Sequence, residues 1–99
     1  MTDAQIEAAY DHMDHNWAEV SQSQTVGCTF CKAQFAVADI HHVYGWDEGA
    51  AFDRPLNEAI PNDTACCPKC DLPYVIGDAS GLPVADQNYL NAVFERWHN

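Results

Sequence analysis

The chain has 99 residues, enough for one domain with a modest hydrophobic core. Apolar residues make up 47% of it and include three tryptophans, which excludes a disordered chain. Fifteen Asp and Glu stand against four Lys and Arg, giving a formal net charge of −11. Such a surface repels phosphate backbones, so we expect no direct nucleic-acid partner.

The N-terminal residues and the cysteines both bear on the compartment in which the protein resides. The chain opens with Thr2-Asp3-Ala4-Gln5 rather than with a basic segment and an apolar stretch, and no apolar run is long enough to cross a bilayer. We therefore expect no signal peptide, no membrane anchor and a cytoplasmic setting. In that reducing compartment, paired cysteine motifs hold metal rather than form disulfides.

Residues 3–20 are predicted to form an amphipathic helix. Thr2 and Gln5 have the pattern of a capping box at its start. Apolar residues recur at intervals of three or four, at Ile6, Tyr10, Met13, Trp17 and Val20. This periodicity places them on one face of a helix, and we interpret that face as packed on the core rather than as a partner-binding surface.

The middle of the chain is predicted to be a zinc-binding core over residues 25–77. Short strands are expected at residues 25–30, 34–37 and 74–76. Residues 38–63 are predicted to be an irregular acidic insertion, because glycines and prolines interrupt them. Apolar residues persist there, so we expect a packed excursion rather than a flexible linker.

A second amphipathic helix is predicted over residues 86–97. Asp86 is suited to the N-cap position, where a carboxylate accepts hydrogen bonds from free backbone N–H groups. The apolar face of this helix comprises Tyr89, Leu90, Val93, Phe94 and Trp97. The whole chain is thus expected to be a single domain, residues 1–99, with a helix at each end.

Two C-x-x-C motifs carry the strongest chemical signal in the sequence. They are Cys28-Thr29-Phe30-Cys31 and Cys67-Pro68-Lys69-Cys70. Each motif turns two sulfurs toward one point, and four thiolates are the tetrahedral set that closes a structural zinc site. We predict that Cys28, Cys31, Cys67 and Cys70 bind one structural Zn²⁺. With four thiolates and one ion, the net charge would be near −13, because −11 − 4 + 2 = −13.

Other metal chemistries fit the pattern less well. Iron is the competing metal, since two C-x-x-C turns also describe a rubredoxin, but Lys32 and Asp71 stand where that family usually carries glycine. Catalytic zinc keeps an open position, which four cysteines would close. Cys66 is interpreted as a small buried residue, with a redox-sensitive thiol or a substitute ligand as the alternative.

The pair His41-His42 suggests an alternative function, a degenerate HNH-like nuclease. Nucleases of the four-cysteine HNH type place a histidine pair between two zinc knuckles with an asparagine after it, and His41, His42 and Asn57 resemble that order, with Asp39 just before the pair. Against this, no histidine or asparagine follows the second knuckle closely, and the charge is wrong for gripping DNA. We favour loop or core histidines here.

From Cys28 to Trp97 the chain resembles a family of small, largely uncharacterised bacterial and phage proteins described as cytoplasmic. The matching residues are Cys28-Thr29-Phe30-Cys31 with Phe35 and Ile40, Thr64-Ala65-Cys66-Cys67-Pro68-Lys69-Cys70, Val75-Ile76-Gly77-Asp78-Ala79-Ser80-Gly81-Leu82-Pro83-Val84, Leu90 and Trp97. The resemblance implies a four-cysteine zinc-ribbon-like core and brings no activity. This chain departs from the pattern between the knuckles, where 35 residues replace a shorter connection.

Together these features predict an α+β fold, a four-cysteine zinc ribbon or treble-clef-like core with amphipathic N-terminal and C-terminal helices. We expect a non-enzymatic, acidic protein-binding module, such as a phage or immunity-type inhibitor, whose partner is a protein with a basic surface. A plain zinc-stabilised subunit whose acids serve only solubility remains the simpler alternative. The expected contact residues, all in the acidic insertion, are Trp46, Asp47, Glu48, Phe52, Asp53 and Glu58.

Overall fold

A computed structural model describes residues 1–47 and 49–99, and these form an α+β fold with two antiparallel sheets. The α-helices are α1 (Asp3–Ala8), α2 (Trp17–Val20) and α3 (Gln87–Trp97). The strands are β1 (Thr25–Cys28), β2 (Gln34–Ala36), β3 (His42–Asp47), β4 (Ala50–Pro55), β5 (Thr64–Ala65) and β6 (Val75–Gly77). Short 3-10 turns are η1 (Ala9–His12), η2 (Val37–Asp39), η3 (Leu56–Glu58) and η4 (Asp78–Ser80). The α+β part of the predicted fold class is confirmed.

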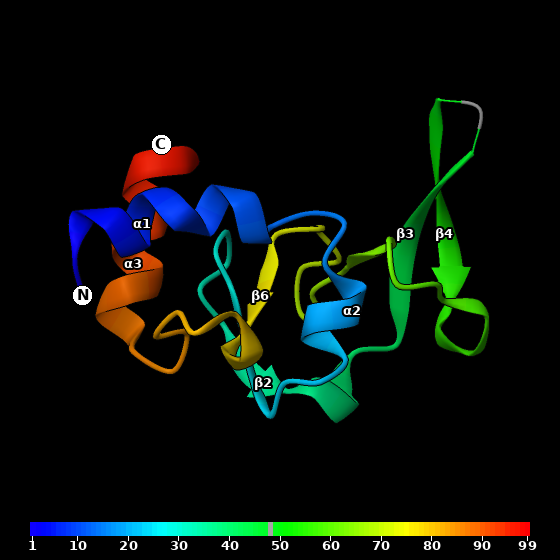
Figure 1. Ribbon diagram of the computed structural model, residues 1–99, viewed down its shortest axis with the longest axis horizontal. Coiled ribbons are helices and arrows are strands. Elements are labelled where there is room, and N and C mark those ends of the chain that lie inside the picture. Colours follow the sequence, from blue (N-terminus) through cyan, green and yellow to red (C-terminus); the bar gives the residue numbers. More distant parts are fainter. Residues whose placement is uncertain (48) are drawn as a thin grey trace.

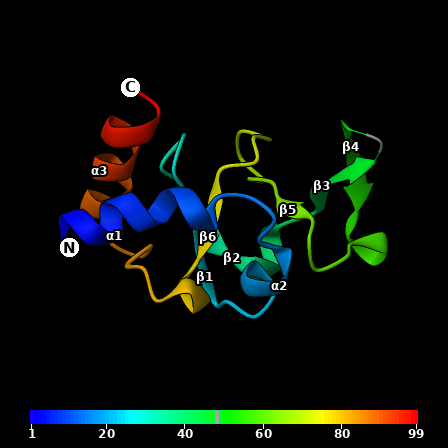
Figure 2. The same cartoon turned by 45° about the horizontal axis from the view of Figure 1, so that its top comes forward.

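The first sheet has the strand order β2-β1-β6 and lies at the centre of the molecule (Figures 1 and 2). In its central strand, Val26 pairs with Phe35 on one side and with Gly77 on the other. A Cβ at Gly27 would lie 2.9 Å from a methyl group of Leu90 and 3.1 Å from the backbone oxygen of Val84, so glycine avoids crowding both. The missing side chain lets α3 pack closely on the sheet.

The second sheet has the order β4-β3-β5 and is dominated by the β3–β4 hairpin. Six residue pairs join β3 to β4, whereas β5 pairs only with Val43 and Tyr44. The hairpin therefore continues beyond β5 as a two-stranded ribbon. Figure 1 shows this ribbon at the opposite end of the molecule from α1, α3 and both termini.

Two clusters of buried side chains make up the core. The first joins the N-terminal helical segment and α3 to β6, with Ile6 and Ala8 of α1 packed against it. Its buried members are Ala9, Met13, Ile76, Leu82, Val84, Tyr89, Leu90 and Val93. The second lies between the central sheet and the cysteine turns and contains Val20, Val26, Cys28, Phe35, Ile40, Ala65, Cys67 and Val75. Two of the predicted zinc ligands are therefore part of the hydrophobic core itself.

The prediction of one helix over residues 3–20 is wrong in its extent. The chain forms α1, η1 and α2 in succession, and it breaks at His15, whose φ is +49°. The break has a tertiary cause, because the buried Asn16 side chain donates to Val75 O and accepts from Ala65 N–H. The N–H of Trp17 donates to Asp63 O instead of continuing the first helix.

The predicted apolar stripe of this segment is only partly buried. Met13 and Val20 lie in the core, whereas Tyr10 is 61% exposed and rests on the ring of Trp97, with 4.9 Å between the ring centroids. The capping box of Thr2 and Gln5 is confirmed, with hydrogen bonds in both directions. The start of α1 was therefore readable from local sequence, and its end was not.

The prediction that residues 38–63 are irregular is also wrong. Most of that segment forms strands β3 and β4, which pair as an antiparallel hairpin. The C-terminal helix is confirmed: α3 covers Gln87–Trp97, and the Asp86 carboxylate accepts from Asn88 N–H as its N-cap. Within the described residues, no helix combines the length and apolar character needed to span a bilayer.

Candidate metal centre

The four predicted ligands, Cys28, Cys31, Cys67 and Cys70, come together as one group, with their sulfurs all within 4.8 Å of one another. Cys28 Sγ lies 3.7 Å from Cys70 Sγ, and Cys31 Sγ lies 3.6 Å from Cys67 Sγ. A tetrahedron with zinc–sulfur bonds of about 2.3 Å has sulfur–sulfur edges of about 3.8 Å. The donor set and its spacing therefore fit a four-thiolate metal site.

Each pair of cysteines lies in a tight turn of the same construction. In the first, Cys28 N–H donates to Ala33 O at 2.9 Å, and Lys32 N–H donates to Cys28 O at 3.0 Å. In the second, Cys67 N–H donates to Leu72 O at 3.0 Å, and Asp71 N–H donates to Cys67 O at 2.9 Å. We call these turns, residues 28–33 and 67–72, the two knuckles.

The residue after each knuckle's second cysteine has a left-handed backbone. Lys32 has φ +68° and Asp71 has φ +65°. Glycine adopts this conformation without a steric penalty, whereas other residues pay for it. The absence of glycine at these positions, which we counted against a rubredoxin-like site, therefore did not prevent the knuckle geometry from forming.

Backbone N–H groups point at the sulfurs. Cys31 N–H donates to Cys28 Sγ at 3.4 Å, and Lys69 N–H donates to Cys67 Sγ at 3.3 Å. Burial raises the pKa of the Cys28 thiol above its usual range and raises that of Cys67 to about 11. Burial also acts to raise the pKa of Cys31, but hydrogen bonds from Ala33 N–H and the neighbouring thiols outweigh it, so that pKa is lowered. Metal binding must therefore expel protons from the buried thiols.

Half of the chain's four Lys and Arg residues lie within the two knuckles, at Lys32 and Lys69. The Lys32 ammonium sits 4.4 Å from the centroid of the Phe94 ring, which places this cation between the first knuckle and α3. Four thiolates around a divalent ion carry a net charge of −2. Two lysines beside such a cluster offset that charge in a chain that is otherwise strongly acidic.

Cys66 does not belong to the cysteine group, as predicted for a small buried residue. It is fully buried, and its thiol lies 3.9 Å from Thr64 O. Burial, with a contribution from the carboxylates of Asp53 and Asp71, raises its pKa to about 12. A thiol with so high a pKa is not ionised at neutral pH and is a poor nucleophile.

The residues predicted to contact a partner lie on or near the hairpin. Trp46 and Phe52 are 47% and 38% exposed, and the Asp53 side chain is 72% exposed. Glu58 is exposed on η3, after the hairpin. Asp47 ends β3, and Glu48 lies outside the described residues.

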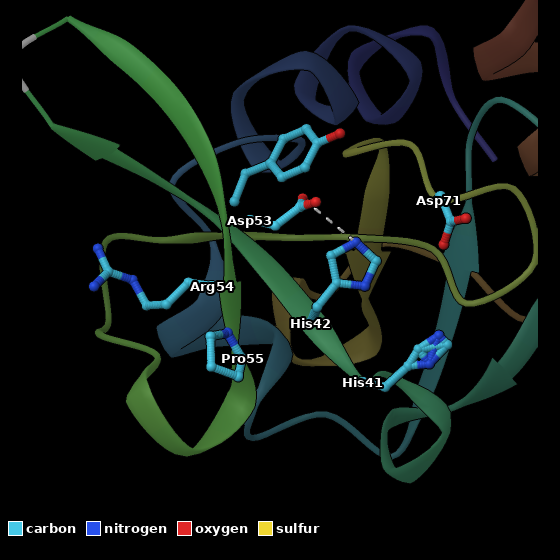
Figure 3. A pocket seen from close by; sticks show the side chains of 7 residues that line it. His41, His42, Asp53, Arg54, Pro55 and Asp71 are labelled. Atoms are coloured by element: carbon cyan, nitrogen blue, oxygen red, sulfur yellow. Dashed lines mark ion pairs between the residues drawn. The ribbon is translucent and has the colours of Figure 1, made fainter.

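A second group of metal-binding side chains lies beside the hairpin, and sequence reasoning found only part of it. His41, His42 and Asp71 offer ligand atoms within 4.8 Å of one another. They line a cavity of about 410 Å³ together with Tyr44 and Asp53 (Figure 3). The histidines were singled out for their adjacency, whereas Asp71 had no local signal. Asn57, the asparagine of the nuclease pattern, lies on η3 and is not among the lining residues.

Comparison with known proteins adds nothing to these geometric findings. No family model, no curated protein and no solved structure matches the chain. The resemblance noted from the cysteine motifs stays a prediction.

Proposed function

We propose that the four cysteines hold one structural Zn²⁺ and that the central sheet with its two knuckles is a zinc ribbon. The 3.6 and 3.7 Å sulfur–sulfur distances support this proposal, because they match the edges of a zinc–thiolate tetrahedron. Four sulfurs leave no position for water or substrate, so the ion serves architecture. It links β1 and β2, which flank the first knuckle, to β6, which follows the second.

We further propose that the chain is a small acidic protein-binding module that contacts its partner through the β3–β4 hairpin. The observation that carries this proposal is the projection of the hairpin from the body with two large aromatic side chains exposed (Figure 1). Trp46 pairs with Ala51, and Phe52 pairs with Gly45. Because side chains alternate along a strand, the two aromatics lie on opposite faces of the ribbon.

The backbone of the hairpin is also available for binding. β4 is an edge strand. β5 pairs only with Val43 and Tyr44, so in the described sheet the outer half of β3 has β4 on one side and no strand on the other. Exposed strand edges accept an added strand from another chain through main-chain hydrogen bonds. Exposed aromatic residues next to such an edge supply the anchors that dominate interface energies.

Charge supports a basic partner. Residues 38–63 contain six acids and one basic residue, Arg54, and Arg54 Nε is already paired with Asp63 Oδ2 at 2.8 Å. An acidic surface accelerates encounter with a basic protein and disfavours nucleic acid. A phage or immunity-type inhibitor that covers a basic active site or a nucleic-acid-binding surface is a role that such a module would serve.

Capture from a host lysate, followed by affinity measurement on the captured protein, tests the proposal. The zinc-loaded chain should retain a basic protein, and raised salt should weaken the complex. The double variant Trp46→Ala/Phe52→Ala should weaken it about 30-fold, the equivalent of about 2 kcal/mol. Neutralising two of the exposed acids with Asp53→Asn/Glu58→Gln should mainly slow association.

The matched control is Tyr10→Ala, which removes an aromatic that is 61% exposed but packs on Trp97 of α3, the helix at the end of the molecule opposite the hairpin. Its affinity for the captured protein should equal that of the unaltered chain. Capture of no protein would overturn the proposal. So would a captured protein that binds Trp46→Ala/Phe52→Ala and the unaltered chain equally well.

A further inference from the structure

Two adjacent histidines, His41 and His42, stack their rings at the start of the hairpin. Successive side chains of a regular strand point to opposite faces. His42 begins β3, but His41 precedes it, and the two rings stack nearly parallel, with centroids 5.6 Å apart and planes 9° apart. Both imidazoles therefore face the same region of the surface.

The third side chain that lies with these histidines is that of Asp71, which comes from a distant part of the chain. Asp71 follows His42 by 29 residues and lies in the second knuckle, where its N–H donates to Cys67 O. Its left-handed backbone, with φ +65°, belongs to the knuckle geometry. The knuckle thereby presents the Asp71 carboxylate to the histidine pair, and the ligand atoms of all three lie within 4.8 Å of one another.

The space between these side chains can hold an ion and its waters. The cavity has a volume of about 410 Å³ and is open to solvent through the exposed His41 and Asp71. In Figure 3, His42 stands between Asp53 and Asp71. Asp53 Oδ1 lies 3.9 Å from His42 Nε2, close enough to become a hydrogen-bond partner after a small rotation.

Local charge favours a cation at this place. Two carboxylates, Asp53 and Asp71, line the cavity. Arg54 also lines the cavity, but its guanidinium is paired with the Asp63 carboxylate and lies beside Gly45. Figure 3 shows Arg54 pointing away from the histidines. The cavity therefore combines an excess of carboxylates with two imidazoles whose ring nitrogens can bind a metal.

We propose that His41, His42 and Asp71 form a second metal site, which takes one divalent first-row transition ion such as Zn²⁺. Two imidazoles and one carboxylate suit these ions, whereas Mg²⁺ and Ca²⁺ favour oxygen ligands. Bond lengths of about 2.1 Å require ligand atoms about 3.4 Å apart in a tetrahedral site. The exposed His41 and Asp71 side chains close the remaining gap by rotation, and water completes the coordination.

This second site depends on the first for its shape. Asp71 is held by the knuckle that contributes Cys67 and Cys70, so the knuckle must be closed before the carboxylate can meet the histidines. The two sites differ in their ligands, sulfur in one and nitrogen with oxygen in the other. Their occupancies can therefore be measured separately.

The experiment begins with protein that contains one zinc ion per chain, bound by the four thiolates. Titration with Zn²⁺ in a calorimeter at pH 7.5 should show one further ion bound, with a micromolar dissociation constant. His42→Asn and Asp71→Asn should each weaken this second event about 100-fold. Asp53→Asn should weaken it about tenfold, because Asp53 acts by positioning the His42 ring. Imidazole resonances of His41 and His42 should shift on addition of the second equivalent.

The matched control is His15→Asn. His15 Nε2 also lies 3.9 Å from a carboxylate, that of Asp14, but His15 is outside the cluster, and asparagine tolerates its left-handed backbone. The second binding event should be unchanged in this variant. Each variant is first checked to retain one thiolate-bound zinc and an unchanged far-UV spectrum. Binding of no second ion, or equal affinity in His42→Asn and the unaltered chain, would overturn the proposal.

Discussion

The metal centre and the β3–β4 hairpin are organised in opposite ways. The metal centre joins two C-x-x-C motifs that have 35 residues between them, and Cys28 and Cys67 are part of the buried core. The hairpin is built from neighbouring residues, and at its outer end Trp46 and Phe52 stay exposed. The metal centre stabilises the fold by joining distant segments of the chain. The outer end of the hairpin is free to contact another molecule.

The hairpin is nevertheless anchored at its base. Val43 is fully buried, and Arg54 is paired with Asp63, which is only 2% exposed. Beyond these contacts the Trp46 ring lies 5.9 Å from the His15 ring, and the rest of the ribbon depends on its own cross-strand pairs. An isolated two-stranded ribbon is marginally stable in water. Its stability and that of the metal centre should therefore respond to different substitutions.

Removing the metal should have the largest effect on stability. It should act on the metal centre, the region that joins distant segments of the chain. A structural zinc ion contributes about 10 kcal/mol or more to folding, comparable to the whole net stability of a small domain. Exhaustive chelation, or Cys67→Ser, should therefore unfold the central sheet. Far-UV circular dichroism and zinc content per chain measure this.

Cys66→Ala is the control for cysteine replacement, because Cys66 is buried next to Cys67 but lies outside the sulfur cluster. It should retain one zinc ion per chain and a cooperative unfolding transition. An unchanged spectrum after chelation would mean that the four sulfurs do not hold a structural ion.

Gly45→Ala should have an intermediate effect, confined to the hairpin. A Cβ at Gly45 would lie 2.5 Å from Arg54 Nη2 and 2.9 Å from Arg54 Nε. The guanidinium would have to leave Asp63, whose buried carboxylate would lose its ion pair, at a cost of about 2 kcal/mol. Denaturant unfolding of the zinc-loaded protein measures the loss, and the zinc content should not change.

A double-mutant cycle with Arg54→Ala isolates this mechanism. In the Arg54→Ala background, Gly45→Ala should cost much less, because the group that it displaces is already absent. Equal costs in the two backgrounds would show that the clash with Arg54 is not the cause.

Asp71→Gly should have the smallest effect on stability. This variant is informative because we expect it to raise the free energy of unfolding rather than lower it. Asp71 has φ +65° and an exposed side chain, so glycine would remove backbone strain and lose little packing. We expect a gain of about 0.5 kcal/mol in the free energy of unfolding. The same variant should lose the second zinc-binding event, so that stability and metal binding change in opposite directions. A loss of stability would contradict the strain argument.

Local pattern was sufficient for some features of this protein. The spacing of Cys28, Cys31, Cys67 and Cys70 predicted the sulfur cluster, because a C-x-x-C turn converges its sulfurs whatever surrounds it. Periodicity and the Asp86 cap likewise predicted α3 nearly to the residue. The hairpin was missed, although large ring side chains stand at every second position, at His42, Tyr44 and Trp46, before Gly49. The glycines and acids of this segment were given more weight than that alternation.

The sequence by itself thus determined the cysteine quartet, the acidic charge and the helix at the C-terminal end, since each depends on residues close together in the chain or on composition. Only the tertiary structure decided where the N-terminal helix breaks, because the break is set by hydrogen bonds from Asn16 to Ala65 and Val75. It alone brought Asp71 to His41 and His42. Contacts between distant segments depend on how the knuckles and sheets pack, and no local period or spacing encodes that packing.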